Sequence, residues 1–139
     1  MRKSKFARAA ALLSGLAVVG ASAVGTAGTA SASNDGGCGE FVHASYACVT
    51  LDDGVVNYSG FTDYTYGSGT VHLMLWDYTQ EPGGVVVFTT DFPIATDGPH
   101  YYQPGGLADP SPGHDYKAEM RVRWDDGSEN RYLSPDLIV

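Results

Sequence analysis

The chain is poor in cysteine and in positive charge, and each shortage excludes a class of protein. Its 139 residues include two cysteines, too few for a scaffold built from several disulfides. Lysine and arginine together number 8, against 16 acidic residues. Such a chain offers no basic patch for nucleic acid or for an anionic membrane. No window of ten or more residues shows an apolar stripe with a 3.6-residue period, so long helices are not expected.

Common catalytic and metal-binding patterns are also missing. The histidines form no H-x-H or H-E-x-x-H spacing, and no serine stands in a G-x-S-x-G elbow. The four histidines are His43, His72, His100 and His114. Carboxylate pairs for glycoside hydrolysis can be drawn from Asp63, Asp77, Asp91 and Asp97, but sixteen acids make chance pairs common. We therefore predict a protein that is not an enzyme and has no metal or cofactor.

The first third of the chain has the order of a secretory signal peptide. Basic residues at 2–8 precede an apolar run rich in Ala and Gly, and T-A-S-A-S then places a cleavage site after Ala32. A retained membrane anchor would need about 20 strongly apolar residues, and Ser14, Gly15 and Gly20 interrupt this run. We predict that residues 1–32 are removed and that the protein is secreted. Residues 33–39 are predicted to form a flexible mature N-terminus.

Processing changes both the charge and the meaning of the cysteines. Removing residues 1–32 leaves four basic and sixteen acidic residues, a formal charge of −12. The 107 remaining residues suffice for one domain, predicted at 40–139. In an oxidising compartment, Cys38 and Cys48 predict one disulfide that closes a loop of about ten residues. The alternative, a nucleophilic Cys48 with His43 as its base, is much rarer for such a pair.

Short apolar or alternating runs, separated by Gly, Pro and Asp, predict an all-β sandwich or barrel. We expect strands at 41–49, at 55–66 with an interruption at Gly60, at 70–78 and at 85–90. The third is apolar on both faces, as in a central strand. Residues 91–115 hold five of the seven prolines. Because proline cannot donate to a sheet, this segment is predicted to be mostly connection, with at most a short edge strand near Tyr101.

The stretch K-A-E-M-R-V-R-W-D-D-G-S-E-N-R-Y predicts a β-hairpin. Apolar and charged residues alternate strictly from Tyr116 to Asp125, as in a strand with one buried face. D-D-G-S suits the turn, with Gly127 at positive φ, and E-N-R-Y-L-S returns as the partner strand. A calcium loop would need spaced oxygen ligands and a Glu at its twelfth position, which this stretch does not supply. Weak calcium binding stays a secondary alternative.

The sequence L-A-D-P-S-P-G-H-D-Y-K-A-E-M-R-V resembles the late strands of fibronectin type III and other immunoglobulin-like domains. This resemblance implies a small immunoglobulin-like antiparallel β-sandwich, in which the Tyr116 hydroxyl bonds to upstream backbone. It also implies that Trp76, in V-H-L-M-L-W-D, is a core tryptophan. Residues 108–111 lengthen the usual Leu-to-Gly spacing, and a disulfide-bearing strand precedes the domain. The resemblance carries no activity.

Aromatic residues give the clearest indication of a binding role. Alternation places Tyr64 and Tyr66 on one face, and the adjacent Tyr101 and Tyr102 must point to opposite sides of their segment. Because tyrosine anchors protein interfaces and stacks on sugars, these four are our candidate partner-binding residues. The residues predicted to have structural roles are Trp76, Tyr116, Trp124 and Gly127.

These observations favour a secreted, non-catalytic protein-binding module whose partner is another secreted protein. We expect an adaptor or accessory subunit of an extracellular assembly, toxin-like assemblies included, with S-N-D-G-G-C-G-E-F available to dock as an added strand. One alternative is an inhibitor of an extracellular hydrolase that presents the segment Thr96–Gly106 as a loop. A further alternative, motivated by the tyrosines, is a carbohydrate-binding module.

Overall fold

The computed structural model describes residues 35–139, so the predicted signal peptide and residues 33–34 lie outside the described part. Residues 35–139 contain no helix long and apolar enough to cross a membrane. They form nine strands: β1 (Gly37–Cys38), β2 (Ser45–Asp52), β3 (Val55–Tyr64), β4 (Gly69–Asp77), β5 (Val85–Pro93), β6 (Gly98–Ala108), β7 (Asp115–Trp124), β8 (Glu129–Leu133) and β9 (Leu137–Ile138).

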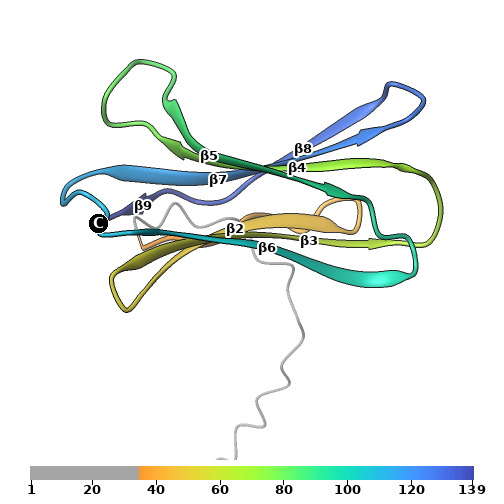
Figure 1. The fold of residues 1–139 in the computed structure, drawn as a ribbon, viewed down its shortest axis with the longest axis horizontal. Helices are drawn as coiled ribbons and strands as arrows, with labels where there is room; N and C mark the ends of the chain where they lie inside the picture. Colours follow the sequence, from red (N-terminus) through yellow and green to blue (C-terminus); the bar gives the residue numbers. More distant parts are fainter. Residues whose placement is uncertain (1–34) are drawn as a thin grey trace, which may run out of the picture.

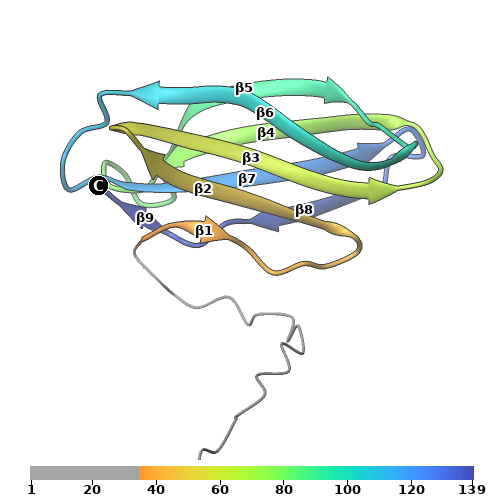
Figure 2. The same cartoon turned by 90° about the horizontal axis from the view of Figure 1, so that it is seen from below.

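The strands build two antiparallel sheets packed face to face (Figures 1 and 2). One sheet has the order β1-β2-β3-β6 and the other β5-β4-β7-β8, with β9 paired to β7. Cys38 and Cys48 lie opposite each other on β1 and β2 and form the predicted disulfide. The predicted antiparallel β-sandwich with one N-terminal disulfide is therefore confirmed. A nucleophilic Cys48 is excluded, because its sulfur is bonded.

The core lies between the sheets and follows from period-two alternation. On β7, Ala118, Met120 and Val122 are fully buried between their charged neighbours. The other buried hydrophobic residues of the core are Ala47, Val49, Val56, Tyr58, Val71, Leu73, Leu75, Tyr102, Tyr116, Tyr132 and Leu137. β4 lies between β5 and β7, which confirms its prediction as a central strand.

The predicted hairpin joins β7 to β8. Gly127 has φ 88°, and its backbone N–H donates to the Trp124 carbonyl at 2.9 Å. Asp126 accepts hydrogen bonds from the backbone N–H and the hydroxyl of Ser128, at 2.8 and 2.6 Å. The turn is therefore closed by its own side chains, and the hairpin interpretation is confirmed.

The prediction that 91–115 is mostly connection is wrong. β5 continues to Pro93, and β6 is a strand of eleven residues. β6 can hold two prolines because it is an edge strand whose one partner among residues 35–139 is β3. Pro104 lies at a bulge, where the register shifts between Tyr58 and Gly60 of β3, so the ladder there needs no donor from it.

The described part of the predicted flexible N-terminus is held in place. Asp35 bridges to Leu137, and β1 pairs with β2 next to the disulfide. The Gly39 backbone N–H donates to the Ala47 carbonyl at 2.8 Å. Pairing and a covalent bond thus order residues 35–39, which composition alone had indicated to be flexible.

The two aromatic positions implied by the resemblance differ in outcome. Tyr116 is buried; burial raises the pKa of its hydroxyl, and a hydrogen bond with the backbone of Ser111 opposes that rise. Trp76 is not a core residue, because alternation along β4 places it on the outer face. It stacks there on Tyr78, with ring centroids 6.0 Å apart. Leu75 occupies the buried position beside it.

Candidate functional site

The structure separates the four tyrosines predicted to bind a partner. Tyr101 is 65% exposed on the outer face of β6, and Tyr66 is 81% exposed just after β3. Tyr64 is half-buried at the end of β3. Tyr102 is a correction: it is 2% exposed, and its hydroxyl accepts a hydrogen bond from the Ala95 backbone N–H at 2.8 Å. It belongs to the core and cannot contact a partner.

Tyr101 is one member of an aromatic group on the outer surface, which we call the aromatic row: Phe41, Tyr46, Phe61 and Tyr101. Phe41 and Tyr101 are exposed, and Tyr46 and Phe61 are half-buried. Tyr46, Phe61 and Tyr101 are direct cross-strand neighbours on β2, β3 and β6. Ring centroids lie 5.0 Å apart for Tyr46–Phe61 and 4.8 Å apart for Phe61–Tyr101. Phe41, just before a tight turn, lies 6.0 Å from Tyr46 and 6.1 Å from Phe61. Such cross-strand aromatic pairs stabilise one another and hold their rings in fixed positions.

The row faces away from the core. Ala47, Gly60 and Tyr102, the chain neighbours of its three strand members, are buried, so alternation turns the row outward. Phe41 is 55% exposed. Burial, and then a hydrogen bond with Tyr101, raise the pKa of Tyr46.

A strained turn presents Phe41. Val42 and Ser45 exchange two backbone hydrogen bonds of 3.0 Å across His43 and Ala44, whose φ angles are 46° and 58°. Two positive φ angles define a type I′ turn, which normally takes Asn and Gly. Non-glycine residues in this conformation cost about 1–3 kcal/mol each and persist where surrounding structure enforces them. His43 and Ala44 therefore have a strained backbone at the point where the chain turns back beside the row.

A cleft of about 800 Å³ opens at the end of the sandwich next to this turn. The turn, the β3–β4 connection and the β7–β8 hairpin form its walls. Its rings come from Tyr64, Tyr66 and Trp124, with Tyr64 set edge-on against Trp124 at 4.9 Å. Gly67 lies against the Trp124 ring, which leaves no room for a Cβ atom.

The cleft is acidic. Asp63, Asp125 and Asp126 line it, and no Lys or Arg is among its lining residues in the part of the chain that the structure describes. Asp125 accepts a hydrogen bond from the Ser68 hydroxyl at 2.5 Å. Asp63 is on β3 two residues beyond Phe61, so the acidic cleft and the aromatic row adjoin.

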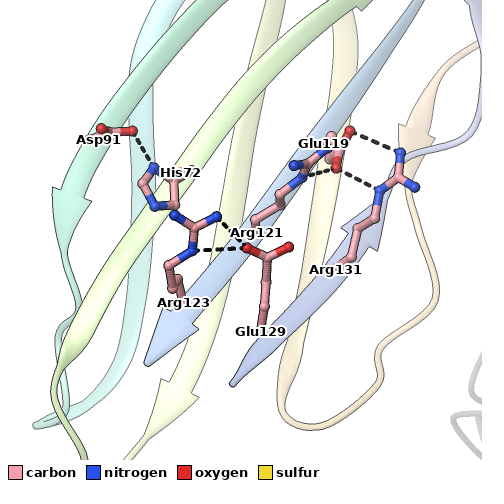
Figure 3. A network of polar contacts seen from close by, with 7 residues as sticks. All are labelled: His72, Asp91, Glu119, Arg121, Arg123, Glu129 and Arg131. Atoms are coloured by element: carbon pink, nitrogen blue, oxygen red, sulfur yellow. Dashed lines mark hydrogen bonds and ion pairs between the residues drawn. The ribbon is translucent and has the colours of Figure 1, made fainter. Parts of the chain in front are cut away.

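The positive charges of residues 35–139 all lie elsewhere, on β7 and β8. Each is paired: Lys117 with Asp136, Arg121 and Arg131 with Glu119, and Arg123 with Glu129, at 2.5–2.9 Å. Figure 3 shows most of this network, together with the His72–Asp91 contact of 2.6 Å. Three carboxylates, those of Glu119, Glu129 and Asp136, pair with these four cations. The other carboxylates therefore leave the rest of the surface, the row and cleft included, negative.

Sequence analysis found Tyr101 but missed Phe41, Tyr46 and Phe61. Alternation shows which residues of one strand share a face, but not which strands are neighbours. The register that brings positions 46, 61 and 101 into line depends on the β2–β3 and β3–β6 pairings. The excess of aromatic residues was the only available signal.

No protein-family model and no curated protein sequence matches the chain. Within residues 35–139, no three His, Cys, Asp or Glu side chains are grouped so that they could hold a metal ion. The aromatic row, the cleft beside it and the distribution of charge are therefore the features from which a function can be inferred.

Proposed function

We propose that the protein is a secreted, non-catalytic protein-binding module that docks on a basic protein partner through the aromatic row. It acts as an adaptor or accessory subunit of an extracellular assembly, a class that includes toxin-like assemblies. The observation that carries this proposal is a contiguous group of aromatic rings on the outer surface, in which Phe41 and Tyr101 are exposed and three of the four rings lie on paired strands. Rings held in this way lose little conformational entropy on binding, and aromatic anchors dominate the affinity of protein interfaces.

The distribution of charge supports a basic partner. Every Lys and Arg of residues 35–139 is engaged in an ion pair on β7 or β8. Around the row and the cleft, Asp63, Asp125 and Asp126 have no basic partner among the described residues. An acidic rim of this kind accelerates association with a basic surface and disfavours acidic competitors.

Strand order supports the finer fold assignment that we propose, an immunoglobulin-like sandwich. Three strands in the order β2-β3-β6 face four in the order β5-β4-β7-β8, with a corner tyrosine at the start of β7. Many domains of this architecture function as binding modules, so the assignment agrees with the proposal but does not carry it.

A test compares exposed residues inside and outside the row. The full chain is expressed with its own leader in the organism that encodes it and is recovered from the culture medium through a C-terminal tag. We expect a stoichiometric companion protein by size exclusion and mass spectrometry. The double variant Phe41→Ser/Tyr101→Ser should reduce its recovery about tenfold or more, because truncating interface anchors commonly costs 1–2 kcal/mol or more each.

The control is Ile138→Ser, which also removes a large exposed apolar side chain but lies on β9, away from the row. It should retain the companion, and all variants should melt close to the wild type. A wild-type protein that elutes alone, or a companion bound equally well by the double variant, would remove the proposal.

The cleft favours carbohydrate binding as a second candidate function. Its aromatic rings and carboxylates match the stacking and hydrogen-bonding groups that bind sugars. Retention of the protein on insoluble polysaccharide, lost in Tyr66→Ser and kept in Phe41→Ser/Tyr101→Ser, would establish it. For the inhibitor alternative, the segment Thr96–Gly106 is not a loop, because its residues 98–106 belong to β6.

A further inference from the structure

The edges of the two sheets are protected unequally. Edge strands expose unpaired backbone groups, and proteins shield them with short length, proline, bulges or charge. β1 has only two residues, β6 carries Pro99, Pro104 and a bulge, and β8 carries Glu129 and Arg131. The fourth edge, β5, has β4 as its one strand neighbour among the described residues.

β5 has few of the features that protect the other edge strands. It reads V-V-V-F-T-T-D-F-P, so Val85–Thr90 contains neither a charge nor a proline. Val85, Val86 and Phe88 are 41, 39 and 41% exposed. A bulge at Val87, where the register shifts between Leu75 and Trp76, leaves Phe88–Phe92 as the regular run. An exposed apolar edge of this kind pairs with another strand unless something covers it.

The same edge leaves part of the core uncovered. Phe88 is opposite Leu75 on β4 and stacks on Tyr58 of the other sheet, with centroids 6.4 Å apart. The Tyr58 hydroxyl also lies 3.5 Å from the Thr90 hydroxyl. Phe88 thus bridges the two sheets but remains 41% exposed at their open side. A strand added along β5 would bury this ring as well as pair the backbone.

We propose that β5 pairs antiparallel with β5 of a second copy of this chain, so that two sheets join across a two-fold axis. Antiparallel pairing of identical strands is self-complementary, which is the condition for a closed dimer. The contact is independent of the aromatic row, which lies on the other sheet.

The distribution of charge identifies a second copy as the occupant. Two chains of formal charge −12 repel, so they can meet only where charge is low or balanced. Next to β5, the outer face of β4, β7 and β8 holds the network of paired charges in Figure 3. Asp91, the only charge on β5, is hydrogen-bonded to the His72 ring at 2.6 Å.

The test measures mass against concentration for the secreted full-length product. Sedimentation velocity should show a monomer–dimer equilibrium. Thr89→Glu, on β5, should weaken dimerisation about tenfold or more, because each copy then brings an extra negative charge, beside Asp91, to the contact. Gln103→Glu introduces the same residue at an exposed position on the β6 edge and should leave the equilibrium unchanged.

A second measurement locates the contact. No cysteine of residues 35–139 is free, so Thr89→Cys and Gln103→Cys each introduce one reactive thiol. A short thiol crosslinker should give a covalent dimer with Thr89→Cys alone. A monomer at every concentration, a dimer that resists Thr89→Glu, or equal crosslinking at both positions would each overturn the proposal.

Discussion

At the scale of single residues, Glu119 departs most from what its position in the sequence indicates. It alternates with buried residues on β7 and faces outward, yet it is fully buried. The guanidinium groups of Arg121 and Arg131 cover it, with hydrogen bonds of 2.5 and 2.6 Å to Oε1 and a third, of 3.1 Å from Arg131, to Oε2 (Figure 3). Alternation predicted the face correctly but could not show that Arg131, on the next strand, closes over the carboxylate.

We expect Glu119→Gln to destabilise the fold by about 2 kcal/mol, because a buried amide replaces a carboxylate that receives three charged hydrogen bonds. Glu129→Gln is the matched control, since it removes an exposed Arg–carboxylate pair, and such pairs contribute about 0–1 kcal/mol. Urea unfolding of the two variants measures the difference. Equal losses would show that burial of Glu119 has no energetic consequence.

The same carboxylate makes stability depend on pH. Burial alone would raise the pKa of Glu119, but the hydrogen bonds from Arg131 and Arg121 outweigh it and hold that pKa below its usual 4.5. The unfolded chain therefore binds a proton more readily than the folded one as the pH falls below about 4.5. Stability from this group is complete above that value and is lost as the pH falls through the folded-state pKa. In the variant Glu119→Gln, the free energy of unfolding should therefore fall less between pH 7 and pH 3 than it does in the wild type.

At the scale of elements, sequence pattern identified strands well and connections poorly. Alternation and turn residues predicted β7, the hairpin after it and the central β4. The same rules failed for β6, because proline was weighed as a strand breaker without knowledge that the strand is at an edge. They also merged the turn at His43 and Ala44 into a strand, since a type I′ turn with neither Asn nor Gly carries no sequence signal.

The disulfide is the element-scale feature with the most direct test. It closes a loop with a sequence separation of 10 and joins β1 to the sheet. The double variant Cys38→Ala/Cys48→Ala should lose about 2–3 kcal/mol in urea unfolding, since the unfolded chain regains the entropy of the open loop. Hydrogen exchange should accelerate at Gly39, whose N–H bonds to Ala47, and stay unchanged in β5. An unaltered unfolding midpoint would contradict this role for the bridge.

At the scale of the whole molecule, the pattern of short alternating runs and turn residues predicted the fold class but not where charge gathers. The count of four basic residues after Ala32 gave the net charge, whereas the contacts of Arg131 with Glu119 and of Arg123 with Glu129 depend on the register of β7 and β8. This segregation gives the molecule a balanced face and an acidic remainder. The two proposed contacts lie in these two electrostatic settings and therefore differ in their response to salt.

Raising the salt concentration from about 0.1 M to about 1 M shortens the Debye length from about 10 Å to about 3 Å. The contact with a basic partner should weaken over this range, because attraction between opposite charges is screened. The β5–β5 contact should strengthen, because the repulsion between two acidic chains is screened while apolar burial and backbone pairing persist. Sedimentation of the protein alone and with its companion measures both responses. If salt dissociates the homodimer, its contact is an ion-paired one and not the uncharged edge of β5.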